Sequence, residues 1–250
     1  MLIQQILGSG GSSGAGDASK VNELIHMFLD KLPQKFQMLD LFAKATERPP
    51  FIVVCLQECE RMNNLLGEIK TSLLELDAGL KGTLNITEAM EGLASALNLN
   101  RVPGSWAAVA YLSKKNLIIW LDDVILRCAQ LEAWSDEFTT PIVLWLSGLF
   151  NPMSFLTAIM QITSRASGLP LDDMCLRTDV RNEYDKEDMT EAAGQGAYVN
   201  GFSLEGAGWE QGRNGEQGYL CDMVLKELSP ALPIVHVTSI RKRERVTVGM

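Results

Sequence analysis

A long uncharged block constrains this protein more than any other feature of its sequence. The block runs from Phe138 to Ser164, is rich in Leu, Ile, Met and aromatic residues, and contains no charged residue or histidine. Its length and apolar character are typical of a membrane-spanning helix. Asn151-Pro152 interrupts it, however, because Asn is a good N-cap and Pro is favoured at the first helical position. The block therefore predicts two shorter segments, Pro141–Phe150 and Pro152–Ser164, in a globular core, and a membrane-spanning helix is the alternative.

Composition narrows the possible partners. A sequence of 250 residues with 46% apolar and 21% charged residues can build a large globular core. The net charge of −9 argues against nucleic acid as a partner, because phosphate binding needs a basic surface. Five cysteines without a framework spacing predict reduced thiols in a cytosolic compartment.

The first part of the sequence reads as a flexible linker followed by helices. Residues 1–19 form a short stub and a Gly/Ser linker that includes Gly8–Gly16, which buries too little surface to order itself. Helical spacing begins at Val21, and Pro33 and Pro49-Pro50 interrupt it. The most regular stretch is an apolar seam with steps of three and four residues: Cys59, Met62, Leu66, Ile69, Leu73, Leu76 and Leu80. This Cys59–Leu80 seam favours packing inside a helical bundle, and pairing with a partner helix is the alternative.

Two further helices follow the seam. Thr87 is expected to cap one of them, with Glu88 and Glu91 near the positive end of its dipole. The other is expected over Asn116–Trp134. Trp106, Trp120, Trp134 and Trp145 are interpreted as anchors of one helical core, because each indole ring can bury a large area.

The sequence pattern changes after Gly168. Asp172–Glu191 is rich in acids but lacks the alternating oxygen ligands and central Gly of a calcium loop, so it predicts a solvated acidic loop. Frequent glycines and short β-prone runs follow it. The expected fold class is α+β, with a helical domain at residues 20–168 and a mainly β domain at residues 169–250.

No residue is predicted to be catalytic, to bind a cofactor or to hold a metal. A GxxxxGK[ST] phosphate loop is absent, and Lys70-Thr71 lies inside a predicted helix. The two histidines, His26 and His236, have no partner for catalysis in the sequence. Cys55 and Cys59 are one helical turn apart without further ligands nearby, and the repeated glycines at 212, 215 and 218 do not follow a strand.

Several sequence blocks carry a resemblance to a known family. WLSGLFNPMSFLTAIMQ (residues 145–161) resembles a signature of the C-terminal region of dynein heavy chains, in particular axonemal ones of the outer-arm type. The helical stretches Leu56–Ala107 and Ala110–Trp134 are similar to the same family, as are LPLDDMCLRTDV, GAYVNGFSLEGAGW and LKELSPALPIVHV further along. The blocks occur in the order of the family, over about residues 20–240.

The resemblance implies a mechanical role. It implies that the N-terminal helical bundle combines lid-like helices of the sixth AAA+ module with helices of the C-terminal domain, and that an antiparallel β-barrel follows. Such a region would brace the AAA+ ring and help couple ATP hydrolysis elsewhere to minus-end-directed movement on microtubules. The implied partners are the rest of the ring, intermediate and light chains and microtubules, in the axoneme of cilia and flagella, with ATP and magnesium bound by other modules. The alternative function is a free-standing helical interaction module that pairs through the Cys59–Leu80 seam.

The end of the sequence departs from the family. After the LPIVHV-like strand, family members continue into further strands, whereas IRKRERVTVGM closes this sequence. The barrel is therefore expected to be incomplete, with an unpaired edge beside Val235, Val237, Val246 and Val248. The Ile240–Arg245 run is interpreted as a charged edge strand or tail, and a localisation patch is the alternative.

Overall fold

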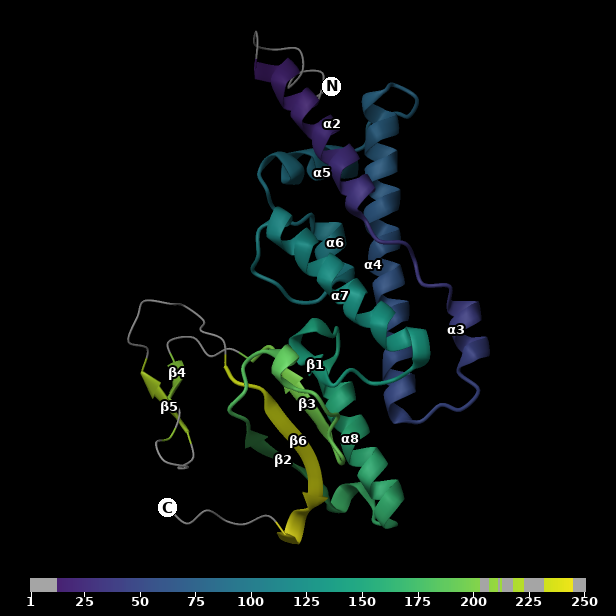
Figure 1. Ribbon diagram of the computed structural model, residues 1–250. Helices are drawn as coiled ribbons and strands as arrows, with labels where there is room; N and C mark the ends of the chain where they lie inside the picture. The colour runs from purple at the N-terminus through teal and green to yellow at the C-terminus, as the bar shows by residue number, and fades with distance from the viewer. Residues whose placement is uncertain (1–12, 203–206, 211, 213–217, 223–231, 245–250) are drawn as a thin grey trace. The chain divides into compact units, whose positions relative to one another are not determined.

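The computed structural model describes residues 13–202, 207–210, 212, 218–222 and 232–244 (Figure 1). The protein divides into two compact units. The first unit comprises Met1–Met38 and Cys59–Ala129, and the second comprises Leu39–Glu58 and Gln130–Met250. These units do not coincide with the ranges 20–168 and 169–250 expected from the sequence. Two long helices, α4 and α7, contribute residues to both units.

The described elements confirm an α+β fold. The helices are α2 (Ser13–Lys31), α3 (Met38–Lys44), α4 (Pro50–Leu80), α5 (Glu88–Asn98), α6 (Gly104–Val109), α7 (Leu117–Glu137) and α8 (Pro152–Ser167). The strands are β1 (Val143–Trp145), β2 (Met174–Val180), β3 (Ala197–Asn200), β4 (Ala207–Glu210), β5 (Tyr219–Asp222) and β6 (Val235–Arg241). Short 3-10 turns lie at η1 (Leu146–Gly148), η2 (Leu171–Asp173), η3 (Lys186–Asp188) and η4 (Lys242–Glu244).

Local sequence signals place several helix ends. The side chain of Thr87 accepts a hydrogen bond from the backbone N–H of Met90 at 3.3 Å, which confirms the predicted cap of α5. Asn151 caps α8 in the same way through the N–H of Ser154 at 3.3 Å, and Pro152 takes the first helical position. Gly168 then ends α8 in the left-handed conformation, which glycine adopts without steric cost.

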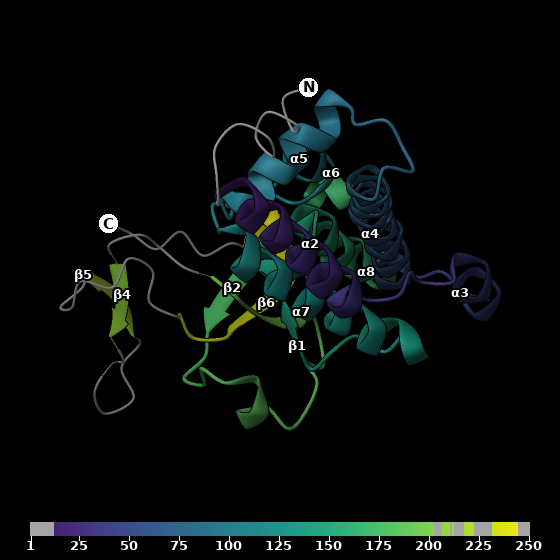
Figure 2. The same ribbon diagram turned by 90° about the horizontal axis from the view of Figure 1, so that it is seen from above.

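The first unit is helical and has an aromatic centre. Figures 1 and 2 both show α2 beside α5, and the two helices are in contact. The ring of Trp106 lies 6.1 Å from Phe28 and 6.0 Å from Trp120 between centroids, and all three side chains are buried. The Nε1–H of Trp106 also donates to the hydroxyl of Ser72 on α4 at 2.8 Å.

The Cys59–Leu80 seam lies inside the protein. Its side chains from Cys59 to Leu76 are at most 1% exposed, and Leu80 is half-buried. Packing inside a bundle is therefore confirmed. The seam is not available to a partner helix, so the alternative function that depended on its exposure is wrong.

The second unit contains a mixed sheet with the strand order β1-β3-β6-β2. The pair β1–β3 is parallel, whereas β3–β6 and β2–β6 are antiparallel. Helix α8 packs against β6 and β2. Because the described strands at the two ends of this order do not pair, the sheet is open and the predicted barrel is not confirmed. β4 and β5 form a separate two-stranded antiparallel sheet.

Gly196 allows β3 and β6 to approach closely. Its φ is +73°, and a Cβ at this position would collide with the backbone carbonyl of Val237 on β6. Residues with a side chain rarely adopt a positive φ. Glycine therefore permits both this backbone conformation and the close approach of the two strands.

Three local expectations are wrong. β1 lies in the range expected to be helical, because its backbone pairs with β3, a strand far away in the sequence. β2 lies within the predicted acidic loop, and an edge strand can carry charges such as the Arg177–Asp179 pair. Helix α2 begins at Ser13, so the residues of the predicted linker from Ser13 to Ser19 are helical, whereas residues 1–12 lie outside the described part.

The expected position of the unpaired edge is wrong where it can be compared, because the open sheet has its edges at β1 and β2 rather than at β6. Val235 and Val237 pair with β2 on one side and β3 on the other, and Val237 is buried. Ile240 and Arg241 lie at the end of β6, where their partners are Cys175 and Met174 of β2, whereas β3 pairs with β6 only at Val235–Val237. Arg245, Val246 and Val248 lie outside the described residues.

The uncharged block is divided among β1, η1 and α8. Leu144, Leu149 and Phe155 within it are buried at 2% exposure or less, as expected for core. Among the helices that the structure describes, none has both the length and the apolar character needed to cross a membrane.

Candidate functional site

The two histidines weighed as chemical candidates from the sequence belong to different units. His26 is exposed on α2, whereas His236 on β6 lies 2.8 Å from the carbonyl of Gln195 through Nε2 and contacts the ring of Tyr198. Cys55 and Cys59 are buried in α4. In the described ranges, His, Cys, Asp and Glu side chains form no group of three that could hold a metal ion.

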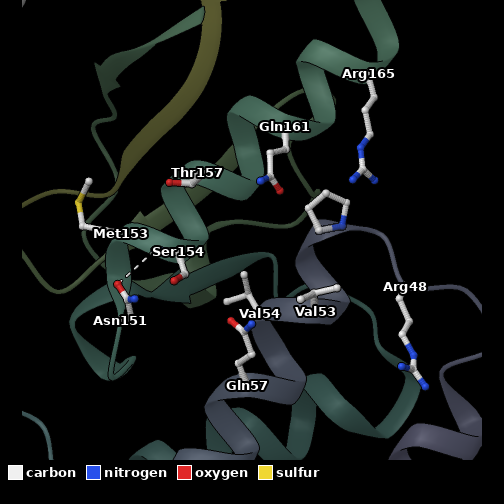
Figure 3. A pocket seen from close by; sticks show the side chains of 11 residues that line it. Arg48, Val53, Val54, Gln57, Asn151, Met153, Ser154, Thr157, Gln161 and Arg165 are labelled. Carbon is white, nitrogen blue, oxygen red and sulfur yellow. Dashed lines mark hydrogen bonds between the residues drawn. The ribbon is translucent and has the colours of Figure 1, made fainter. Parts of the chain in front are cut away.

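A groove of about 500 Å³ lies in the second unit. It lies between the start of α4, with the loop before it, and α8 (Figure 3). Its lining is mostly polar: Arg48, Pro50, Val53, Val54, Gln57, Asn151, Met153, Ser154, Thr157, Gln161 and Arg165. We call this feature the α4–α8 groove.

The charge of the groove is positive. Arg48 and Arg165 line it, and the described lining residues include no acid, histidine, lysine or cysteine. The hydroxyls of Ser154 and Thr157 therefore have no general base among these residues, so the groove lacks the parts of a hydrolytic site. Its side chains are suited to binding carboxylates and amides.

A buried carboxylate holds one wall of the groove in place. Glu58 is 1% exposed and accepts hydrogen bonds from the backbone N–H groups of Phe150 and Asn151, the latter at 3.0 Å. These residues form the turn that enters α8. Phe51 on α4 also stacks on Phe155 of α8 at 4.9 Å between centroids. Both contacts fix α8 against the start of α4.

A second buried charged cluster lies in the first unit. Asp123 on α7 accepts from Lys115 at 2.7 Å and from the Nε of Arg127 at 3.1 Å, and it is 4% exposed. The Arg127 guanidinium lies 3.4 Å above the ring of Tyr111. Lys115 and Tyr111 belong to the segment between α6 and α7, so the cluster ties this segment to α7.

The surroundings in this cluster shift the pKa values of Tyr111 and Asp123. Burial raises the pKa of Tyr111, and the nearby charge of Asp123 adds to this although Arg127 opposes it. Burial acts to raise the pKa of Asp123 as well, but the hydrogen bond from Lys115 and the charge of Arg127 lower it below its ordinary value. At neutral pH the cluster therefore contains a carboxylate and a neutral phenol.

The lowered pKa of Asp123 predicts an acid-sensitive contribution to stability. A carboxylate with a lowered pKa stabilises the fold above its unfolded-state pKa, and this stabilisation is lost as the pH falls through the folded-state pKa. Asp123→Asn should lower the free energy of unfolding by about 2 kcal/mol at pH 7, because hydrogen bonds to a charged group are lost. The difference from wild type should shrink as the pH falls below about 4. Urea unfolding at several pH values measures it.

Asp122→Asn is the matched control, since Asp122 is the exposed neighbour on the same helix. Its effect on stability should be small at every pH. A difference between Asp123→Asn and wild type that stays constant from pH 7 to acid would contradict the assigned role of this carboxylate.

Sequence reasoning missed Glu58 and the Asp123–Arg127 pair. Judged by the spacing of the seam, Glu58 belongs with the charged residues on the other faces of the helix. Glu58 nevertheless lies three residues after Cys55 and four before Met62, which places it on an apolar stripe. An acid at that spacing is a usable signal for a buried carboxylate. Asp123 and Arg127 are separated by one helical turn, which predicts their pairing but not their burial.

Comparison with known proteins decides the family. Residues 1–248 match the family of the C-terminal domain of dynein heavy chains. The protein belongs to this family. The α4–α8 groove, the buried Glu58 carboxylate and the Asp123 cluster are therefore features of a dynein C-terminal domain.

The most similar relatives include axonemal dynein heavy chains. The protein is 44% identical to human dynein axonemal heavy chain 17 over 232 residues, which is 93% of its own length. It is 45% identical to a ciliary dynein beta chain of Heliocidaris crassispina over 88% of its length, and 43% identical to a flagellar outer-arm dynein beta chain of Chlamydomonas reinhardtii over 93%. The match spans only 5% of each relative. The predicted resemblance to axonemal and outer-arm dyneins is confirmed.

Proposed function

We propose that this domain braces the AAA+ ring of an axonemal dynein heavy chain and helps couple ATP hydrolysis elsewhere in that motor to minus-end-directed movement on microtubules. The observation that carries the proposal is the match of residues 1–248 to the C-terminal domain of dynein heavy chains. In this proposal ATP and magnesium are bound by other modules. The domain acts in the axoneme of a cilium or flagellum, as part of the cytoskeleton.

The internal structure supports a mechanical role. Each unit has buried aromatic or charged contacts that join segments distant in the sequence, such as Trp106 with Ser72 and Glu58 with Asn151. Such contacts make a part resist deformation, because closely packed interiors transmit strain. We also propose that the first helices correspond to the lid of the sixth AAA+ module, and that intermediate chains, light chains and microtubules are partners through the parent complex.

The proposal is tested in a complete axonemal dynein heavy chain that includes this domain. Glu58→Ala should loosen the second unit. ATP hydrolysis should continue, but the ratio of microtubule gliding velocity to the rate of ATP hydrolysis should fall. Glu60→Ala changes an exposed acid on the same helix and should leave gliding unchanged. Normal gliding by a motor from which the whole domain has been removed would refute the bracing role.

A separate prediction concerns nucleotide. The 250-residue protein should neither hydrolyse ATP nor show a change in melting temperature with ATP and magnesium, since its sequence lacks a phosphate loop. A ligand that binds the native state raises the melting temperature by linkage, so thermal unfolding with and without millimolar Mg-ATP measures binding. A magnesium-dependent increase would show that these 250 residues include a nucleotide site.

A further inference from the structure

We propose that the α4–α8 groove binds an extended acidic segment from another part of the same heavy chain. This inference rests on the proposed function and adds to it a specific contact site. It is carried by the charge of the groove, by the hydrogen-bonding groups along it and by the length of heavy chain that lies outside this domain.

The charge of the groove is opposite to that of the domain. The protein has a net charge of −9, yet both charged residues among the described lining are arginines, Arg48 and Arg165. Figure 3 shows both arginines on the same side of the groove, with Arg165 directed from α8 toward α4. The guanidinium of Arg48 lies 5.2 Å from the ring of Phe42 and donates to the backbone carbonyls of Ala45 at 3.4 Å and Phe42 at 3.5 Å, which restrains its position. Two guanidinium groups on one side of a groove favour a ligand that carries carboxylates.

The rest of the groove is suited to a peptide backbone. Figure 3 shows Gln57 on α4 and Gln161 on α8 directed into the same space. Each amide can donate to a peptide carbonyl and accept from a peptide N–H. The Oδ1 atom of Asn151 accepts from Ser154, which leaves its amide N–H groups to face the groove. Val53 and Met153 are 37% and 63% exposed and offer apolar contacts to alternate side chains of an extended segment.

The strength of such contacts favours an intramolecular ligand. Arg48 and Arg165 are exposed, and salt bridges at exposed sites contribute little to affinity. A separate acidic protein would therefore bind this groove weakly. The 250 residues correspond to about 5% of the length of their relatives, so most of such a heavy chain is outside the domain and covalently connected to it. A tethered segment has an effective concentration on the order of millimolar, which is enough for weak contacts to form.

Site-specific photo-crosslinking in the complete motor tests the inference. The probe is p-benzoylphenylalanine in place of Val53, which lines the groove, and the same probe in place of Leu126, an exposed residue outside it, is the control. The Val53 probe should crosslink to a heavy-chain peptide that contains neighbouring Asp or Glu residues, identified by mass spectrometry. The Leu126 probe should not crosslink to that peptide.

Charge reversal then tests the arginines. Arg48→Glu with Arg165→Glu should reduce the yield of this crosslink about tenfold, because like charges would face each other, whereas Arg48→Lys with Arg165→Lys should keep most of it. Both arginines are exposed, so thermal unfolding of the double variants should match wild type. An unchanged yield after charge reversal, a crosslinked peptide without acids, or a crosslink to a separate subunit would overturn the inference. Those results leave the gliding assay of the bracing role unaffected, so the two proposals fail separately.

Discussion

Trp106→Ala is expected to lower the free energy of unfolding of the first unit by about 3–5 kcal/mol. The side chain is fully buried between Phe28 and Trp120, and its Nε1–H donates to Ser72 at 2.8 Å. Alanine would leave a large cavity and remove the donor to the half-buried hydroxyl of Ser72, and neighbouring helices can relax only in part. Urea unfolding of the 250-residue protein, followed by far-UV circular dichroism, measures the change.

Two variants separate the causes of this loss. Trp106→Phe keeps most of the ring but removes the N–H donor, so it should cost only about 1–2 kcal/mol. Leu112→Ala is the control, because Leu112 is completely exposed and its truncation should change stability by less than about 0.5 kcal/mol. Equal effects of Trp106→Ala and Leu112→Ala would show that Trp106 does not anchor this core.

The helix boundaries were the most predictable part of the fold. Thr87 and Asn151-Pro152 act through bonds within one helical turn, so a short sequence window contains all the information needed. The Cys59–Leu80 seam was equally readable, because a side-chain spacing of three and four residues defines one face of a helix.

The strands were harder, because their partners are distant in the sequence. Trp145 shows the difficulty. The sequence places it with three other tryptophans in one helical core, whereas both Trp134 and Trp145 belong to the second unit. Trp145 also ends β1 and is half-buried. Its backbone N–H donates to Gln130 at 2.8 Å, and its strand is completed by β3. Only the fold brings these partners together, so no local pattern could assign the strand.

The groove could not be predicted for the same reason. Arg48 and Arg165 are separated by more than a hundred residues, and each reads as an ordinary surface arginine. They line one groove because the Phe51–Phe155 contact and the Glu58 carboxylate place α4 beside the turn that enters α8. The family resemblance in WLSGLFNPMSFLTAIMQ identified the neighbourhood of α8 without indicating which residues face solvent.

Glu58→Ala should lower the free energy of unfolding of the second unit by roughly 4 kcal/mol, because two backbone N–H groups lose a buried, charged acceptor. Glu58 is 1% exposed, and its carboxylate accepts from the N–H groups of both Phe150 and Asn151. Hydrogen exchange of the amides of residues 150–154, compared with those of the first unit, measures the loss locally.

Two matched variants make this prediction sharp. Glu58→Gln keeps one acceptor oxygen of nearly the same shape, so it should retain about half of the stability that Glu58→Ala loses. Glu60→Ala removes an exposed acid two residues further along α4 and should change stability by less than about 0.5 kcal/mol. The expected order of stability is therefore Glu60→Ala, then Glu58→Gln, then Glu58→Ala. If Glu58→Ala unfolds at the same urea concentration as Glu60→Ala, the turn before α8 is held by other contacts, and the carboxylate does not position that wall of the groove.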